Sequence, residues 1–157
     1  MNDNIKDFMS FLDNSPSAYH AAYNLVKMLR AEGYEMLPEH EDWTLLKGGK
    51  YFMIRGGTTL VAFRMPTQMP VGFMMSACHT DRPTFKVKEN GELKGTYTRL
   101  ATERYGGMLI SPWLDRPLSV AGRVMVETET GVRARLFNID RDLMLIPNVA
   151  IHMNRGV

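Results

Sequence analysis

The chain has 157 residues, of which 45% are apolar and 23% are charged, and its 19 Lys and Arg residues nearly balance its 17 Asp and Glu residues. This composition is close to the average of globular proteins, so it argues against a disordered, collagen-like or coiled-coil chain. The formal net charge of +2 and the lack of a Lys/Arg block argue against nucleic acid as a partner.

The cysteine count and the N-terminal sequence indicate the cellular compartment in which the protein is expected. The single cysteine, Cys78, cannot form an intramolecular disulfide, which is typical of a reducing, cytoplasmic setting. The first residues include acids and no long apolar run, so they do not resemble a signal peptide. No stretch approaches the roughly 18 apolar residues that indicate a membrane span. We therefore expect a cytoplasmic protein with no membrane partner.

Two helices are predicted at the start of the chain. Residues 4–13 carry apolar side chains at helical spacing, namely Ile5, Phe8, Met9 and Leu12. A second helix is expected over residues 16–32, with Ser15 as its N-cap and Pro16 at its first helical position. Gly33 is placed to end this helix.

Predicted β-structure follows the helices. Residues 50–55 and 58–64 are rich in β-forming residues and are separated by Gly56-Gly57, which is typical of a β-hairpin with a two-residue turn. Residues 71–78 are almost entirely apolar, which favours a strand covered on both faces, as in an α/β sheet. Together these elements predict a mixed α/β unit.

The pattern changes in the second half of the chain. Beyond Asn90-Gly91, short β-forming runs alternate with turn residues, and residues 118–127 and 132–138 look like paired strands. We therefore place a domain boundary near residue 91. The predicted organisation is an α/β domain over residues 1–91 and a β-rich domain over residues 92–157.

His79-Thr80-Asp81 is the short sequence that points most directly to chemistry. It follows the predicted buried strand, and ligands bind outside the carboxyl ends of the strands in open α/β sheets. A metal-bound imidazole usually donates its second N–H to an acceptor such as a carboxylate, so His-x-Asp can supply a ligand and its orienting partner together. By itself the tripeptide is weak evidence, because a histidine after a strand is more often simply hydrogen-bonded.

Other reactive side chains have simpler interpretations. Cys78 beside His79 suggests a thiol nucleophile with its base, but neighbours on a strand point to opposite faces, so we expect Cys78 to be a small buried residue. His152 lies in an apolar run, where a histidine is usually structural. Asp115 and Arg116 are expected to be turn residues with salt-bridge partners.

Six short blocks occur along the chain in a recognisable order. They are SPSAYH (15–20), CHTDRP (78–83), YGG (105–107), WLDRPL (113–118), AGRV (121–124) and IPNVAIHMNR (146–155). Each block is weak alone, but together they resemble the N-terminal part of the aspartyl aminopeptidase family of zinc metallopeptidases. The resemblance runs from about residue 13 to the end of the chain.

This resemblance implies an activity and an architecture. The family's members are co-catalytic zinc exopeptidases that remove N-terminal residues, often acidic ones, from peptides. They have an α/β catalytic domain with a β-rich domain inserted into it, and the inserted domain builds dimers that assemble into larger particles. The implied fold class is therefore α/β, a partial catalytic domain followed by a β-rich dimerisation domain. The implied partners are peptide substrates, two Zn²⁺ ions per site in the intact enzyme, and further copies of the chain.

The resemblance also implies roles for single residues. His79 matches the first zinc ligand, and Asp81 matches the acid that orients this histidine and tunes the metal. His152 matches the histidine of an Ile-His-x-x-Arg motif, which is associated with the metal or the substrate, in its own subunit's site or a neighbour's; these alternatives stay open. Arg82 departs from the small residue expected before Pro83.

The remaining family ligands, including a Glu-Glu pair and a last histidine, are expected downstream of residue 157. We therefore expect the isolated chain to be a fragment with little or no peptidase activity. The alternative is a non-catalytic assembly or binding module derived from such an enzyme.

Overall fold

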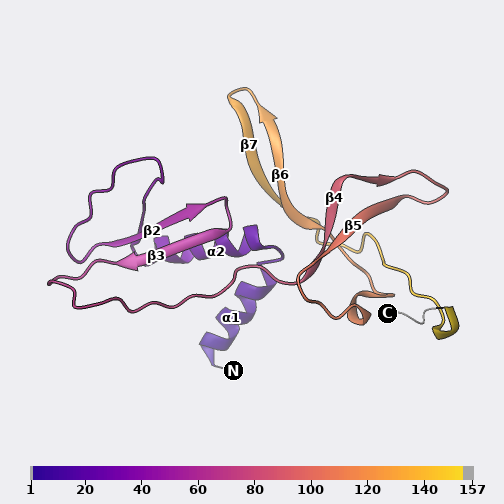
Figure 1. Ribbon diagram of the computed structural model, residues 1–157, viewed down its shortest axis with the longest axis horizontal. Helices are drawn as coiled ribbons and strands as arrows, with labels where there is room; N and C mark the ends of the chain where they lie inside the picture. The colour runs from indigo at the N-terminus through magenta and orange to yellow at the C-terminus, as the bar shows by residue number, and fades with distance from the viewer. Residues whose placement is uncertain (1, 154–157) are drawn as a thin grey trace. The chain divides into compact units, whose positions relative to one another are not determined.

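A computed structural model of the chain describes residues 2–153 (Figure 1). These residues divide into two compact units. The first comprises residues 2–81 and 121–138, and the second comprises residues 82–120 and 139–153. The domain boundary expected near residue 91 stays a prediction.

The first unit begins with α1 (Asp3–Asp13) and α2 (Ala18–Ala31), so both predicted helices are confirmed. Gly33 has a φ of +79° directly after α2, and the N–H of Tyr34 donates to the carbonyl oxygen of Leu29 at 2.9 Å. This is the Schellman arrangement, which uses a left-handed residue to close the last helical turn. None of the helices within residues 2–153 combines the length and the hydrophobicity that crossing a bilayer requires.

The start of α2 differs from the prediction. The N-cap is Ser17 and not Ser15, and the Ser17 hydroxyl accepts a hydrogen bond from the backbone N–H of His20 at 3.4 Å. Ser15 is buried, and its hydroxyl instead accepts from the side-chain amide of Asn24 at 3.2 Å. Both serines are good N-cap residues. The contact with Asn24, made from within the helix, gives Ser15 a different role.

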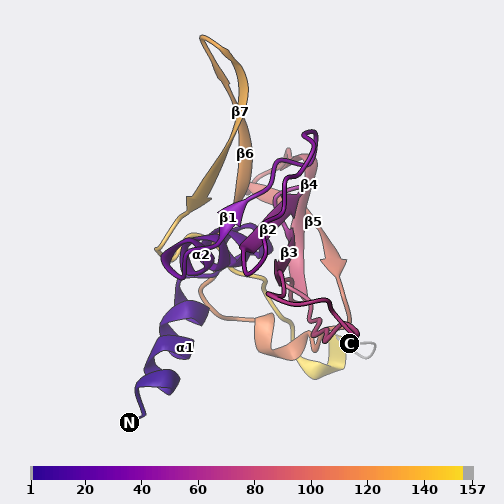
Figure 2. The same cartoon turned by 90° about the vertical axis from the view of Figure 1, so that its left-hand side faces the viewer.

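A small mixed sheet follows the helices in the order β1 (Glu35–Met36), β2 (Lys50–Arg55) and β3 (Thr59–Arg64). The predicted hairpin β2–β3 is confirmed, with Arg55 paired to Thr59 at its closed end. Its connection is Gly56-Gly57-Thr58, three residues rather than two, and both glycines have a positive φ. Figures 1 and 2 show α2 running along one face of this sheet.

The core of the first unit lies around β2. Tyr51 and Phe52 are 3% and 0% exposed, and Ala22 of α2 is also completely buried. Adjacent residues on a strand point to opposite faces, so Tyr51 and Phe52 bury both sides of β2. The Tyr51 hydroxyl accepts the backbone N–H of Leu46 at 2.9 Å, which places the loop before β2 over the Tyr51 side.

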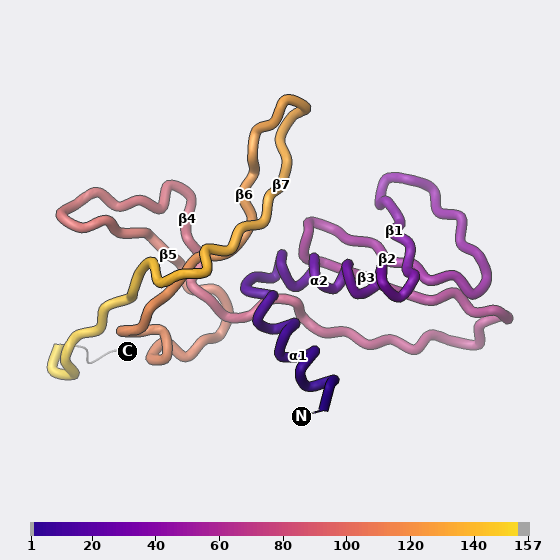
Figure 3. The backbone as a smooth tube through the Cα atoms, turned by 180° about the vertical axis from the view of Figure 1, so that it is seen from behind, coloured from indigo at the N-terminus to yellow at the C-terminus, as the bar shows by residue number. Residues whose placement is uncertain are grey.

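Residues 71–78 are not the buried strand that the sequence predicts. They form an extended segment without strand pairing, and Val71, Phe73 and Met74 are 109%, 92% and 103% exposed. Cys78 is also exposed, contrary to the prediction. No strand among the described residues pairs with this segment, so its apolar side chains have nothing to pack against. The tube in Figure 3 shows the segment as a long open excursion after β3.

The first unit also contains the hairpin formed by β6 (Ala121–Thr128) and β7 (Gly131–Asn138). The predicted strand pair is confirmed, and it is in continuous antiparallel register over the whole length of both strands. Arg123 fixes the base of the hairpin. Its guanidinium lies 4.3 Å from the centroid of the Tyr19 ring and donates to the carbonyl oxygen of Gly56 at 3.1 Å.

The second unit is built on β4 (Thr84–Leu93) and β5 (Arg99–Tyr105), an antiparallel pair with an irregular register between Val87 and Glu92. The short 3₁₀ turn η1 (Ser111–Trp113) packs beside it, where the Trp113 ring meets the Phe85 ring edge-on at 5.4 Å. Together the two units confirm the predicted mixture of helices and sheet, and hence the α/β fold class.

Candidate metal-ligand site

His79 and Asp81 lie in contact across a short turn. The Nδ1 atom of His79 is 2.7 Å from the backbone carbonyl oxygen of Asp81 and 3.2 Å from its carboxylate Oδ1. Both of these atoms are acceptors, so a neutral His79 carries its proton on Nδ1 and donates it to Asp81. The Nε2 atom then holds the lone pair that a metal ion would use.

The surroundings leave this imidazole open. The His79 side chain is 80% exposed and the Asp81 side chain is 39% exposed. Within residues 2–153, no hydrogen-bond partner meets His79 at Nε2. An exposed polar contact of this kind contributes little to stability, so it matters for the orientation and tautomer of the ring rather than for folding.

Thr80, the residue between His79 and Asp81, holds the turn against the sheet. The Thr80 hydroxyl donates to the carbonyl oxygen of Thr58 at 3.2 Å, at the residue just before β3. We expected His79 to lie at the carboxyl edge of a sheet. This expectation is wrong, because the segment before His79 is not a strand. A local turn and one side-chain hydrogen bond position it instead.

The pair fits part of a metal site. A zinc site takes three or four protein ligands, and His79 supplies one imidazole with an orienting acceptor already in place. Within the described part of the chain, no group of three or more His, Cys, Asp or Glu side chains could hold a metal ion. The pair therefore fits the role of one ligand and its partner, and a complete site needs further donors.

His152, the third predicted site residue, belongs to the second unit. It lies in η2 (Ile151–Met153) and is exposed. Asn154 and Arg155, which complete the Ile-His-x-x-Arg motif, lie outside the described residues. The role of His152 stays a prediction.

Asp115 has a structural role that sequence reasoning only partly anticipated. It has a φ of +53°, its Oδ1 accepts the backbone N–H of Asn148 at 2.8 Å, and its own N–H donates to the carbonyl oxygen of Ile146 at 3.0 Å. Instead of the expected salt bridge, its carboxylate ties down a distant backbone segment. The signal in the sequence was the turn-forming Asp itself, since aspartate tolerates a left-handed backbone.

Comparison with known proteins identifies the family behind these features. The sequence model for "Aminopeptidase I zinc metalloprotease (M18)" matches residues 11–157. A Clostridium novyi protein described as "Probable M18 family aminopeptidase 2" is 41% identical over 96% of this chain and 36% of its own length. A Pseudomonas aeruginosa protein with the same description is 39% identical over 94% of this chain and 35% of its own length.

Solved structures give the same result. The chain superimposes on mApe1 of Chaetomium thermophilum with a TM-score of 0.87 and 30% identity, over 95% of this chain and 35% of that one. The S. cerevisiae mApe1 dodecamer gives a TM-score of 0.81 with 25% identity, over 96% of this chain and 36% of that one. In the complex of Ape4 with Nbr1, the TM-score is 0.86 with 38% identity, over 95% of this chain and 30% of that one.

The fold and these matches define a family that is described as "Aminopeptidase I zinc metalloprotease (M18)". The chain belongs to the M18 family, which confirms the resemblance inferred from the sequence blocks. It spans about a third of the length of the curated relatives that it matches.

Proposed function

We propose that this chain contributes the first metal ligand of a zinc-dependent aminopeptidase that removes acidic N-terminal residues from peptides. One observation supports it above the others: Asp81 occupies Nδ1 of His79 and leaves Nε2 for a metal. Membership of a family described as zinc metalloproteases supports the reaction class.

In this proposal each residue has one task. His79 would hold zinc through Nε2, while Asp81 fixes the tautomer and makes the imidazole a better donor. His152 would contact the metal or the substrate, in its own subunit's site or in a neighbour's. A bound pair of zinc ions supplies an activated water and polarises the scissile carbonyl.

We further propose that the isolated 157-residue chain has little or no peptidase activity, because one or two histidines cannot hold a catalytic metal pair. The proposal includes a domain division at residue 91, a cytoplasmic location and a homo-oligomeric assembly. The oligomer is supported by the S. cerevisiae relative, which is described as a dodecamer. A cytoplasmic location is supported by the single cysteine. One cysteine cannot form an intramolecular disulfide, and chains without disulfides are typical of reducing compartments.

The test is a chimera in which this chain replaces the matching region of the Clostridium novyi relative. Chelator-sensitive release of aspartate or glutamate from chromogenic amides is expected, and His79→Ala should abolish both turnover and full zinc content. His40→Ala is the matched control, because His40 is an exposed histidine of the same unit that lies against its neighbour Glu41. Full zinc content and turnover in the His79→Ala chimera would refute the proposal.

The exposed apolar segment at residues 71–78 favours a second candidate function, an assembly or binding module without catalysis. Size-exclusion chromatography with metal analysis of the 157-residue chain separates the two. Zinc bound in a one-to-one ratio supports a retained metal site. A metal-free oligomer supports the assembly role.

A further inference from the structure

The second unit contains a cavity with a mostly apolar lining. Its volume is about 310 Å³, and it is lined by Phe85 of β4, Arg104 of β5, Ile110, Leu114 and residues 146–149. This volume lies at the lower end of the range for small-molecule sites, about 300 to 1,000 Å³. The cavity is therefore of a size to take a small organic molecule.

Ring packing and hydrogen bonds fix the walls of the cavity. The ring centroids of Phe85 and Trp113 are 5.4 Å apart in an edge-on contact, which holds the Phe85 ring in place. The carboxylate of Asp115 accepts the N–H of Asn148 at 2.8 Å, and the N–H of Asp115 donates to the carbonyl oxygen of Ile146 at 3.0 Å. Walls that are fixed before a ligand arrives lose less conformational entropy when it binds.

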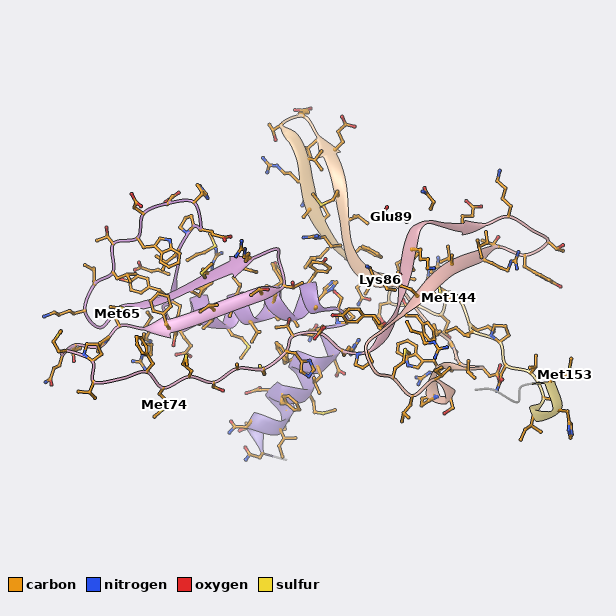
Figure 4. The ribbon with its side chains drawn as sticks, in the orientation of Figure 1. Met65, Met74, Lys86, Glu89, Met144 and Met153 are labelled. Carbon is orange, nitrogen blue, oxygen red and sulfur yellow. The ribbon has the colours of Figure 1, made fainter. Side chains whose placement is uncertain are left out.

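Arg104 is the charged residue of the lining. It pairs with Phe85 in the β4–β5 register, so the two side chains stand side by side on one face of the hairpin. Within the part of the chain that the structure describes, no carboxylate forms an ion pair with Arg104. One position along β4, Lys86 (Figure 4) does have such a partner, since its Nζ lies 3.3 Å from the carboxylate of Glu103. The charge of Arg104 is therefore available to a ligand.

The chemistry of the lining defines the class of ligand. A guanidinium presents paired N–H donors that match the two oxygens of a carboxylate. The other polar residue, Asn148, already accepts the N–H of Val149 through Oδ1 at 2.9 Å. One cation in an apolar cavity balances one negative charge, whereas a dianion would bring an uncompensated charge out of water. Phe85 and Pro147 favour an aromatic or aliphatic body for the rest of the ligand.

We propose that this cavity of the second unit binds a small monocarboxylate with an aryl-alkyl body, the carboxylate on Arg104 and the ring against Phe85. The proposal uses neither His79 nor His152, so it does not depend on the proposed peptidase activity. The portion of M18 polypeptides that this chain does not span is the competing occupant, and it is an outcome of the experiment.

The test is a titration of the 157-residue chain with hydrocinnamate and with its uncharged amide, followed by NMR. The acid is expected to bind at least about tenfold more tightly than the amide, because one charged, hydrogen-bonded pair supplies a difference of this size. The indole N–H signal of Trp113, which contacts Phe85, should shift, and that of Trp43, in the first unit, should not. Equal affinities, or an unmoved Trp113 signal, would overturn the proposal.

Arg104→Gln should make the acid and the amide bind equally. Arg104 is exposed, so its replacement should leave the fold intact. Arg99→Gln is the matched control, because Arg99 lies on the same strand, outside the lining, and donates to the carbonyl oxygen of Lys94 at 3.3 Å. It should keep the preference for the acid. An unchanged preference in Arg104→Gln would contradict the assignment of the carboxylate to this residue.

Val149→Trp tests whether the ligand lies inside the cavity. Val149 is part of the lining and is 52% exposed, so a larger side chain can fill the cavity without disturbing a packed core. Binding of hydrocinnamate should weaken by at least about tenfold. Leu145→Trp, at a 59% exposed residue outside the lining, should leave it unchanged. Equal effects of the two substitutions would show that the ligand binds elsewhere.

The same titration is made with the Clostridium novyi chimera and with its His79→Ala variant. Both should bind hydrocinnamate as tightly as the 157-residue chain does, so failure of the peptidase proposal is distinguishable from failure of this one. Loss of binding in the chimera would assign the cavity to the remaining portion of the polypeptide and would overturn the proposal.

Discussion

Asp81 holds the His79 ring more closely through its backbone carbonyl, at 2.7 Å, than through its carboxylate, at 3.2 Å. The two acceptors have separable tasks. The carbonyl is present whatever the side chain at position 81, so the backbone alone can keep the proton on Nδ1. The carboxylate adds negative charge, which raises the electron density that Nε2 offers to a metal.

Asp81→Ala is therefore expected to retain the Nδ1-protonated tautomer of His79 and to weaken zinc binding by about 10- to 100-fold in the chimera. Nitrogen-15 NMR of the imidazole in the 157-residue chain measures the tautomer, and metal titration of the chimera measures the affinity. Asp81→Asn is the control for side-chain volume. A change to the Nε2-protonated form in Asp81→Ala would show that the carboxylate, not the carbonyl, sets the tautomer.

Arg123 links the β6–β7 hairpin to α2 and to the β2–β3 turn. Arg123→Ala removes both the contact with the Tyr19 ring and the hydrogen bond to Gly56, so we expect a loss of about 1 kcal/mol in the free energy of unfolding. Urea denaturation followed by circular dichroism measures the change. Arg135→Ala, on the facing strand, should have an effect within about 0.5 kcal/mol. Equal losses in the two variants would show that the hairpin is not anchored at Arg123.

His20 should make stability depend on pH. Burial lowers the pKa of His20 below its ordinary value of 6.5, and its Nδ1 lies 2.8 Å from the Ser17 hydroxyl. The unfolded chain therefore binds a proton at a higher pH than the folded chain. The stabilisation is present above pH 6.5 and is lost as the pH falls through the lowered pKa of the folded state.

The pH effect is measured by urea denaturation at a series of pH values, comparing the parent chain with His20→Gln. The parent should lose stability relative to His20→Gln as the pH is lowered below neutrality. His40→Gln, at the exposed loop histidine, should follow the parent curve. Parallel curves for the parent and His20→Gln would contradict the expectation.

Gly33 should resist substitution even though there is room for a side chain. A Cβ atom at this position would meet nothing within 4 Å, but its φ of +79° is strained for any L-residue other than glycine. Gly33→Ala is expected to cost about 1 kcal/mol of unfolding free energy, measured by thermal or urea denaturation. Gly72→Ala, also with open space but without a positive φ, should be neutral or slightly stabilising in the free chain. Neutrality at Gly33 would mean that α2 ends differently in solution.

Several features follow from short-range sequence information. The helices α1 and α2, the hairpin β2–β3 and the pair β6–β7 lie close to where apolar spacing, glycines and β-forming residues placed them. The His-x-Asp contact was also anticipated, since two residues separated by one can meet across a turn as well as along a strand. The ordered sequence blocks identify the family without any information from the geometry.

The features that were predicted wrongly depend on groups far away in the chain. Ser15 and Ser17 are equivalent as cap candidates until Asn24 takes up the Ser15 hydroxyl. The expected salt bridge of Asp115 gave way to a hydrogen bond with the backbone of Asn148, 33 positions along the chain.

The amino-acid sequence by itself determined the two helices, the hairpins β2–β3 and β6–β7, and the family, because these depend on neighbouring residues and their order. Only the tertiary structure decided that residues 71–78 stand uncovered and that a turn, rather than a sheet edge, orients His79. The physical reason is that an apolar run expresses a need for burial, whereas burial itself requires a partner surface in the right place.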